Sequence, residues 1–191
     1  NTITGNGRGG VDIRGSYALL ESNRIKGNGG CGVKADAGST VEGQDNAILG
    51  NEEDLCGVSR GLLETTPPPA PEELRVDPAD WTNGPITVDW DSPKDPSGIA
   101  AFWYKIGKAP RWSEDGTRLE ISRKPLVLET PPEGRQPIYL WLEDGLGNKS
   151  QANRAQATIL ADRTPPQIHY TIEPQPNENG WNNSEVTVRF Q

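Results

Sequence analysis

The chain has 191 residues, and 19 Lys and Arg against 27 Asp and Glu give it a formal net charge of −8. This acidic balance, without any basic cluster, argues against a nucleic-acid partner, because phosphate binding relies on clustered Lys and Arg. Apolar runs are only a few residues long, whereas a membrane-spanning helix needs about 20, so we expect no membrane insertion.

A six-residue pattern, Asn-x-Ile-x-Gly-Asn, recurs three times near the N-terminus. Its copies occupy residues 1–6, 23–28 and 46–51, so the spacing is 22 and then 23 residues. A second marker follows each copy, as Gly9-Gly10-Val11, Cys31-Gly32-Val33 and Cys56-Gly57-Val58. Short apolar alternations separated by Gly- and Asn-rich turns predict about three short strands in each unit. Units of this length favour stacked coils, with like residues about 4.8 Å apart.

These repeats resemble the right-handed parallel β-helix family of pectate-lyase-like proteins, over roughly residues 1–62. The resemblance implies that the recurring Asn side chains form an internal amide ladder at a turn. The stack is expected to end after Asn51, where Glu52-Glu53-Asp54 replaces Gly-rich sequence. The first copy already follows the pattern and the chain has no Met. We therefore expect a fragment, with further coils upstream in the parent protein.

The only two cysteines, Cys31 and Cys56, occupy the same position of the second marker. Stacked coils would bring their Cα atoms to about 5 Å, within the range that a disulfide requires. An oxidising, extracellular setting favours the bond, and a reduced, buried thiol pair is the alternative. Two cysteines without a nearby His do not make a zinc site.

A second repeat follows the coils. Thr65-Thr66-Pro67-Pro68 and Arg163-Thr164-Pro165-Pro166 are extended spacers 98 residues apart, and each precedes a Trp-led strand start, at Trp81 and Trp181. We therefore divide the chain into the last coils of a β-helix at 1–64, a Pro-rich linker at 65–73, a complete module at 74–163, and a truncated second module at 164–191.

The complete module predicts an antiparallel sandwich. Period-two alternation marks strands around residues 74–76, 86–90, 102–106, 138–142 and 157–159, with turn sequences between them. The markers Asp95-Pro96-Ser97-Gly98 and Asp144-Gly145-Leu146-Gly147-Asn148 resemble those of tandem bacterial Ig-like repeats of exported surface proteins. The predicted fold class is all-β: C-terminal coils of a right-handed parallel β-helix, then an Ig-like or fibronectin-III-like β-sandwich, and the start of a second one.

The sequence offers no catalytic set. The single histidine, His169, has no Ser, Cys or Asp partner in a recognisable pattern and is read as a strand-surface residue. β-Helix enzymes that act on acidic polysaccharides use clustered carboxylates with an Arg or Lys on one outer face. The coils offer Asp12, Arg14, Lys34 and Asp36. In register, Asp12 stacks on Lys34 and Arg14 on Asp36, which favours a solvated charge ladder over catalysis.

We expect no cofactor and no metal from a spacing-defined loop. Calcium candidates lie near Asp89, Asp91 and Asp95, and at Asp144 with Asn148, because Ca²⁺ takes several oxygen ligands. Turn-capping by these side chains is the alternative interpretation.

The aromatic residues suggest a binding surface. If Trp90 anchors the core and residues 104, 106, 140 and 142 face inward, then Trp103, Tyr139 and Trp141 point outward and form one patch. Exposed rings of this kind stack on sugars, which makes the three residues candidates for glycan binding. The alternative is that the patch packs on a neighbouring module or on Trp112 in a loop.

Three function hypotheses follow. The first, which we favour, is an extracellular structural or adhesive protein of the bacterial surface, with polysaccharide or further copies of itself as partners. The second is a fragment of a polysaccharide lyase or glycoside hydrolase whose active site lies in upstream coils. The third is a carbohydrate-binding accessory region that uses the aromatic patch.

Overall fold

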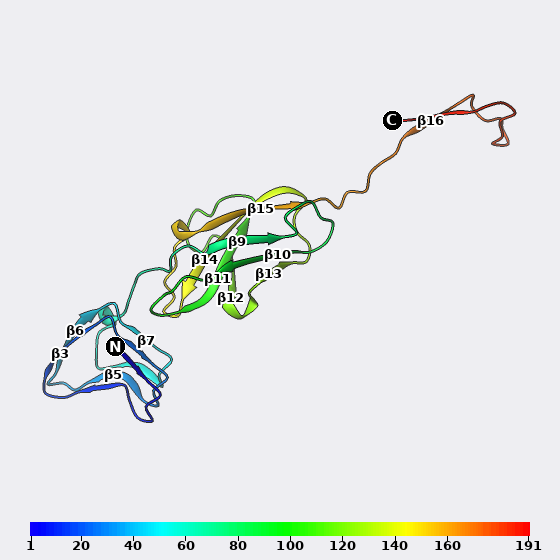
Figure 1. Cartoon of the computed structure of the whole chain (residues 1–191). Coiled ribbons are helices and arrows are strands. Elements are labelled where there is room, and N and C mark those ends of the chain that lie inside the picture. The colour runs from blue at the N-terminus through cyan, green and yellow to red at the C-terminus, as the bar shows by residue number, and fades with distance from the viewer.

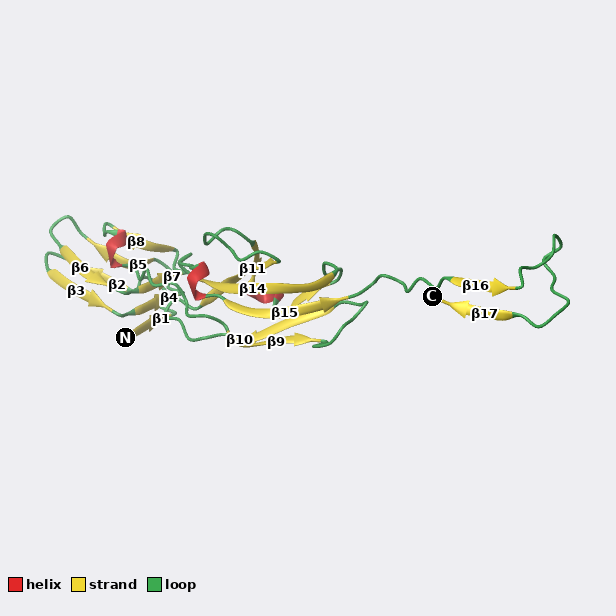
Figure 2. Ribbon diagram, turned by 90° about the horizontal axis from the view of Figure 1, so that it is seen from above, coloured by secondary structure: helices red, strands yellow, loops and turns green.

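The computed structural model describes residues 1–191 and is all-β, as predicted. Parallel strands occupy the N-terminal part, antiparallel strands follow, and an isolated hairpin ends the chain (Figure 1). The three parts follow one another along the long direction of the molecule (Figure 2). None of its helices has the length and apolar character needed to cross a membrane.

The N-terminal part is a stack of short coils. Three parallel sheets form its sides, in the orders β1-β4-β7, β2-β5-β8 and β3-β6. The strands are β1 (Thr2–Thr4), β2 (Val11–Ile13), β3 (Tyr17–Glu21), β4 (Arg24–Lys26), β5 (Cys31–Ala35), β6 (Thr40–Gln44), β7 (Ala47–Leu49) and β8 (Glu53–Cys56). The 3-10 helix η1 (Arg60–Leu62) closes the stack.

Equivalent residues of successive coils lie above one another. Ile3 pairs with Ile25, and Ile25 with Ile48. Ile13, Ile25, Val33 and Ile48 are the buried core of the stack. This small apolar interior exists only because neighbouring coils cover each other, as expected for repeat architectures.

The predicted amide ladder is present at one turn. The side chain of Asn1 donates to Asn23 Oδ1 at 3.2 Å, and both the backbone and side-chain nitrogens of Asn23 donate to Asn46 Oδ1 at 3.0 Å. Asn46 Nδ2 in turn donates to the carbonyls of Leu20 at 2.8 Å and Leu62 at 2.9 Å. The ladder satisfies buried backbone groups that the tight turn leaves unpaired.

The last Asn of the six-residue pattern forms a second ladder. Asn6 donates to Asn28 Oδ1 at 3.0 Å, and Asn28 Nδ2 donates to Asn51 Oδ1 at 2.8 Å. Asp54 Oδ1 then accepts from Asn51 Nδ2 at 2.9 Å, which ends the ladder with a carboxylate. The asparagine ladder therefore ends where Glu52-Glu53-Asp54 replaces the Gly-rich sequence, whereas parallel pairing continues through β8, which lies beside β5.

Cys31 and Cys56 form a disulfide with their Cα atoms 5.9 Å apart. Their expected equivalence within the coils is wrong, because the register of β5 and β8 places Glu53 opposite Cys31 and Lys34 opposite Cys56. The bond therefore links β5 to β8 out of register with the ladder.

The middle part is a sandwich of seven strands. One sheet has the order β13-β10-β9 and the other β12-β11-β14-β15, and all pairs are antiparallel. The first sheet contains β9 (Glu72–Asp77), β10 (Ile86–Asp91) and β13 (Leu126–Leu128), and the second β11 (Ile99–Ile106), β12 (Thr117–Glu120), β14 (Gly134–Asp144) and β15 (Ala155–Ala161). The short 3-10 helices η2 (Ile121–Arg123) and η3 (Gln151–Asn153) lie in its connections.

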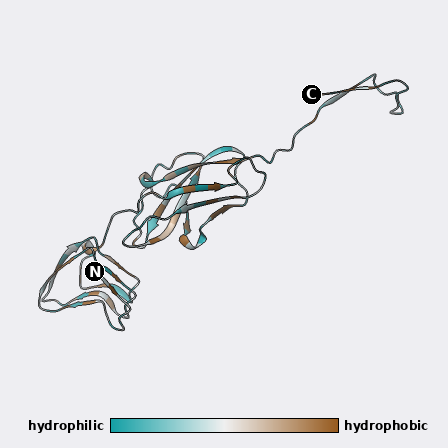
Figure 3. Cartoon of the chain, viewed as in Figure 1, coloured by the Kyte–Doolittle hydropathy of each residue, from teal (hydrophilic) through white to brown (hydrophobic).

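The sandwich core matches the predicted alternation. Trp90 is fully buried and meets Phe102 edge to face, with ring centroids 4.8 Å apart. The inward positions of β14, Ile138, Leu140 and Leu142, belong to the same cluster. Apolar and polar residues alternate along these strands, as the hydropathy colouring shows (Figure 3). This cluster holds the two sheets together and fixes the turns at their ends.

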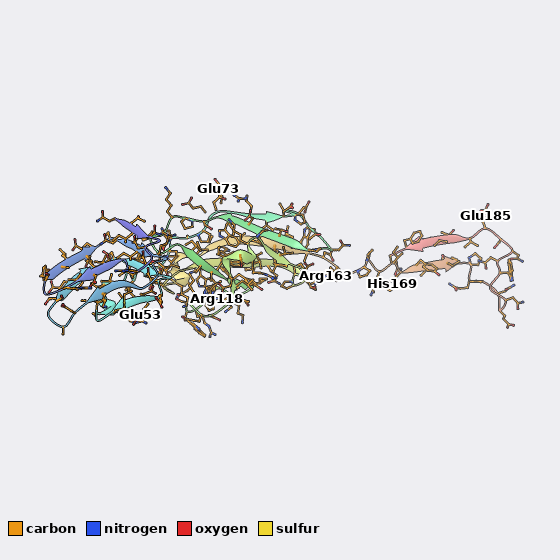
Figure 4. All side chains as sticks on the ribbon, turned by 90° about the horizontal axis from the view of Figure 1, so that it is seen from below. Glu53, Glu73, Arg118, Arg163, His169 and Glu185 are labelled. Atoms are coloured by element: carbon orange, nitrogen blue, oxygen red, sulfur yellow. A yellow bond between two sulfur atoms is a disulfide. The ribbon has the colours of Figure 1, made fainter.

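The last part is the hairpin of β16 (Tyr170–Glu173) and β17 (Thr187–Phe190). Its apolar side chains are exposed, with Trp181 at 73% and Phe190 at 74%. Figure 4 labels His169 at the base of this hairpin, apart from the sandwich. The imidazole is exposed and makes no hydrogen bond or ion pair, which agrees with a surface role.

Candidate functional site

The predicted aromatic patch is on the predicted face of the sheet but is not exposed. Trp103 of β11 lies opposite Trp141 of β14, and the two indole rings stack with centroids 6.2 Å apart. Trp141 is 0% exposed and Trp103 is 9% exposed. Tyr139 is half-buried beneath the Arg154 guanidinium, 5.7 Å from the ring centroid. The expectation of an open glycan-stacking surface at these residues is therefore wrong.

The connection between β11 and β12 covers Trp141. The indole Nε1 of Trp141 donates to the carbonyl of Ser113 at 3.0 Å. Gly116 lies against the ring so closely that a Cβ at this position would be 2.6 Å from it. The alternative that the rings pack on the loop containing Trp112 comes closest to this arrangement, although Trp112 itself stays 49% exposed.

Asp115 holds this covering loop in place. Its carboxylate accepts from Lys105 Nζ at 2.6 Å and from the Arg111 backbone N–H at 3.0 Å. These hydrogen bonds, with that from Lys105 the stronger cause, lower the pKa of Asp115 to about 2. The loop is thus fixed to β11 by a charge pair that strand periodicity did not reveal.

The Trp103 side of the pair is closed by charged residues. Glu143 accepts from Trp103 Nε1 at 2.8 Å and from Arg118 Nε at 3.0 Å, while Lys149 lies 5.6 Å from the Trp103 ring centroid. Burial alone raises the pKa of Glu143, but the hydrogen bonds from Arg118 and Trp103 outweigh it and hold the pKa below its usual value. Figure 4 labels Arg118 on the sandwich. The Glu143 carboxylate therefore joins the Trp103 indole to the Arg118 guanidinium on this side of the ring pair.

The charged residues on the outer face of the coils pair differently from the expected ladder. Asp12 does lie opposite Lys34, but it pairs at 2.6 Å with Arg14, the residue that follows β2. Asp36 accepts from Ser39 at 2.6 Å instead of meeting Arg14. The Asp12 and Arg14 side chains are 46% and 74% exposed, so this is a solvated ion pair of small energetic weight.

The calcium candidates of the sequence separate into two places. Asp91 lies at the end of β10 and pairs with Arg75 at 2.8 Å, in the group that also contains Asp89. Asp95 and Asp144 instead meet each other and a third residue, Glu64, with carboxylate oxygens within 4.8 Å of one another. Glu64 was missed because it stands at the end of the coil region, far from the two turns in sequence. We call Glu64, Asp95 and Asp144 the junction carboxylates.

Each junction carboxylate is positioned by a different element. The coil stack places Glu64, whose N–H donates to the Asn46 carbonyl at 3.0 Å just beyond η1. In the turn before β11, Asp95 accepts from the Ser97 N–H at 2.8 Å. In the turn after β14, Asp144 Oδ1 accepts from the Asn148 N–H at 2.8 Å.

Direct hydrogen bonds connect the coil stack to the sandwich at the same point. Ser97 Oγ donates to Glu64 Oε2 at 2.6 Å, and Asn148 Nδ2 donates to the Glu64 carbonyl at 3.1 Å. Farther along the linker, Asn153 Nδ2 donates to the Pro68 carbonyl at 2.8 Å. The Asp-x-Ser-Gly and Asp-Gly-x-Gly-Asn turns are therefore the contact surface of the sandwich for the coils.

The junction brings negatively charged side chains together in a largely buried place. Glu64 is 4% exposed and Asp144 is 1% exposed, while Asp95 is half-buried. Burial, followed by the charges of Asp144 and Asp95, raises the pKa of Glu64 despite the hydrogen bond from Ser97. Burial and the charge of Asp144 likewise raise the pKa of Asp95.

A cleft of about 580 Å³ lies beside the junction. The last coil lines it with residues such as Leu49, Leu55 and Arg60, and the turn after β14 contributes Gly145 and Leu146. Glu53 and Asp54 also line it, and residues of both parts meet at its walls, so we describe it as part of the contact between the two parts.

Comparisons with known proteins identify no relative by sequence. No family model matches the chain, and no curated protein matches it. Among solved structures, chitinase ChiA74 from Bacillus thuringiensis matches with a TM-score of 0.39 and 13% identity, over 74% of this chain and 22% of the chitinase chain. The match thus spans about a fifth of the chitinase, and at this TM-score it carries no information on the function of the present chain.

Proposed function

We propose that this chain is a structural segment of an extracellular protein, in which a parallel coil stack continues into Ig-like modules as one stiff rod. The single observation that carries the proposal is the junction, where Glu64 is held by Asn46 of the coils and by Ser97 and Asn148 of the sandwich. If the linker were flexible, these polar groups would be hydrated and would not be buried between the two parts. Here Oε2 and the backbone carbonyl of Glu64 accept hydrogen bonds across the boundary, which favours a fixed orientation.

Two further features support a structural and extracellular role. The Cys31–Cys56 disulfide belongs to the last coils, and such bonds persist in oxidising compartments. The stacked asparagines pair each coil with the next along the axis. The stacked tryptophans are covered and offer no open surface to a polysaccharide. Contact with polysaccharide therefore stays a prediction without an assigned surface.

The stiffness of the junction is directly measurable. Spin labels at Thr40→Cys in the coils and Ser122→Cys in the sandwich, both exposed positions outside the contact, would report the distance across it by pulsed electron resonance. A single narrow distribution is expected, and Ser97→Ala with Asn148→Ala should broaden it. A matched control, Ser113→Ala, removes a hydroxyl of the sandwich away from the junction and should leave the distribution unchanged.

A broad distribution in the otherwise unaltered chain would refute the rod. Cleavage of an acidic polysaccharide by the purified chain would instead favour the lyase or hydrolase hypothesis.

A further inference from the structure

The junction carboxylates accept hydrogen bonds from neighbouring N–H and O–H groups but have no cationic partner. No Lys or Arg nitrogen lies within 4.0 Å of Glu64, Asp95 or Asp144, although every other region of the sandwich that buries an acid supplies one. Oε1 of Glu64 is buried and has no hydrogen-bond partner at all. An unpaired buried carboxylate oxygen carries a large desolvation cost.

The guanidinium of Arg24 does not resolve this imbalance. Arg24 of β4 lies beside the turn that carries Asp95, with which it lines a shared cleft. Its charge lowers the pKa of Asp95 but is the weakest of the influences on that group. The Nε of Arg24 is itself buried without a partner. The positive charge of this one guanidinium, which makes no ion pair, therefore cannot balance the negative charge of three clustered carboxylates.

We propose that the junction carboxylates bind one Ca²⁺ ion, with the free oxygen of Glu64 and the carboxylates of Asp95 and Asp144 as its protein ligands. The coil stack supplies one ligand and the sandwich the other two, so the ion joins the two parts. This inference goes beyond the structural role proposed above and does not depend on it.

The ligand atoms of the three side chains indicate which class of metal they would bind. All three side chains offer only oxygen, and no His lies near them, which disfavours zinc and other metals that prefer nitrogen or sulfur. Ca²⁺ accepts irregular oxygen cages and completes its shell with water, whereas Mg²⁺ demands near-octahedral geometry and dehydrates reluctantly. Extracellular calcium modules bind with dissociation constants of about 10⁻⁴–10⁻³ M, and we expect this range here.

The sequence repeat also places an acidic residue before the second spacer. Glu64 precedes Thr65-Thr66-Pro67-Pro68, and Asp162 precedes Arg163-Thr164-Pro165-Pro166 at a distance of 98 residues. In this chain Asp162 is exposed, and its carboxylate accepts from the Thr164 N–H at 3.1 Å. Glu64 and Asp162 thus occupy equivalent positions of the repeat, each directly before a spacer that ends in two prolines.

Titration calorimetry of the full 191-residue chain with CaCl₂, after removal of divalent ions with a chelator, tests the proposal. We expect one ion per chain and a thermal midpoint that rises in 10 mM CaCl₂ but not in 10 mM MgCl₂. Asp95→Asn should weaken calcium binding at least tenfold. It retains an oxygen that can accept from Ser97, and Asp95 is only half-buried, so this variant should fold.

Asp91→Asn is the matched control, because it removes the same charge from a surface ion pair in the same module and should bind calcium as the parent does. Circular dichroism without calcium establishes that both variants are folded. Glu64→Gln provides a second test from the coil side of the junction.

The proposal is overturned if the parent chain shows neither binding heat nor a thermal shift. It is also overturned if Asp95→Asn and Glu64→Gln bind calcium as tightly as Asp91→Asn, or if magnesium acts equally. A chain that binds calcium but gives a broad spin-label distance would refute the rod and leave the ion site intact.

Discussion

The hydroxyl of Ser97 donates a 2.6 Å hydrogen bond to the carboxylate of Glu64, across a boundary between two different β architectures. Both residues are buried, at 4% exposure each. Ser97 belongs to a turn whose residues also fit the ordinary role of a turn cap. In the tertiary structure the same residue also binds the end of the coil stack. The short turn motif therefore both shapes its loop and contacts the coils that precede the sandwich.

Replacement of Trp141 should destabilise the sandwich rather than remove a binding surface. Trp141→Ala empties a fully buried site, and such changes cost about 3–5 kcal/mol. Trp112→Ala, at a 49% exposed ring, should cost well under half as much. Urea unfolding followed by the remaining tryptophans measures both. Equal stability of Trp141→Ala and the parent would contradict the covered position of the ring.

Asn46→Ala should loosen the last coils. The side chain accepts from Asn23 and donates to three carbonyls, among them those of Leu20 and Leu62. Each buried group left unpaired costs about 1–3 kcal/mol. Hydrogen exchange should accelerate across β4 and β7 while the amides of β14 stay protected. Asn182→Ala, in the exposed hairpin, is the control, and unchanged exchange in Asn46→Ala would argue against a supporting ladder.

Loss of the disulfide should open the end of the coil stack. Cys31 and Cys56 are 25 residues apart, and bonds that close loops of this size contribute about 2–4 kcal/mol. Cys31→Ser with Cys56→Ser, or reduction of the parent, should speed proteolysis within residues 50–63. The sandwich should be cut no faster. Identical cleavage patterns with and without reductant would show that the bond does not hold the coil end.

The loop over Trp141 should depend on pH through Asp115. The pKa of this carboxyl is lowered to about 2 by Lys105 and Arg111, below its ordinary value of 3.8. A lowered pKa stabilises the folded state at pH values above 3.8, and the contribution is lost as pH falls through about 2. Asp115→Asn should therefore lower the thermal midpoint at pH 6.

The difference between Asp115→Asn and the parent should shrink as the pH approaches 2 and the parent carboxyl becomes protonated. Exposed Glu178, which makes no ion pair, provides a control as Glu178→Gln. A constant difference at all pH values would indicate that shape, and not charge, explains the effect of Asp115→Asn.

Two strands of the sandwich escaped prediction for identifiable reasons. β12 (Thr117–Glu120) contains a single apolar residue, Leu119, and β13 (Leu126–Leu128) has only three residues. Such short edge strands carry too few positions for a period to be seen. They form because β11 and β10 offer them free edges, which is information that local sequence does not contain.

Sequence periodicity was enough to predict the stacked coils, the asparagine ladder and the alternation of the sandwich core. Each of these repeats a side-chain pattern at a fixed period, so that every copy reports the same local environment. Tertiary structure alone decided which polar and aromatic residues are accessible. A connecting loop covers Trp141, charged side chains close the Trp103 side, and the chain brings Glu64 to Asp95 and Asp144. Both outcomes depend on contacts between distant segments, which no periodic pattern encodes.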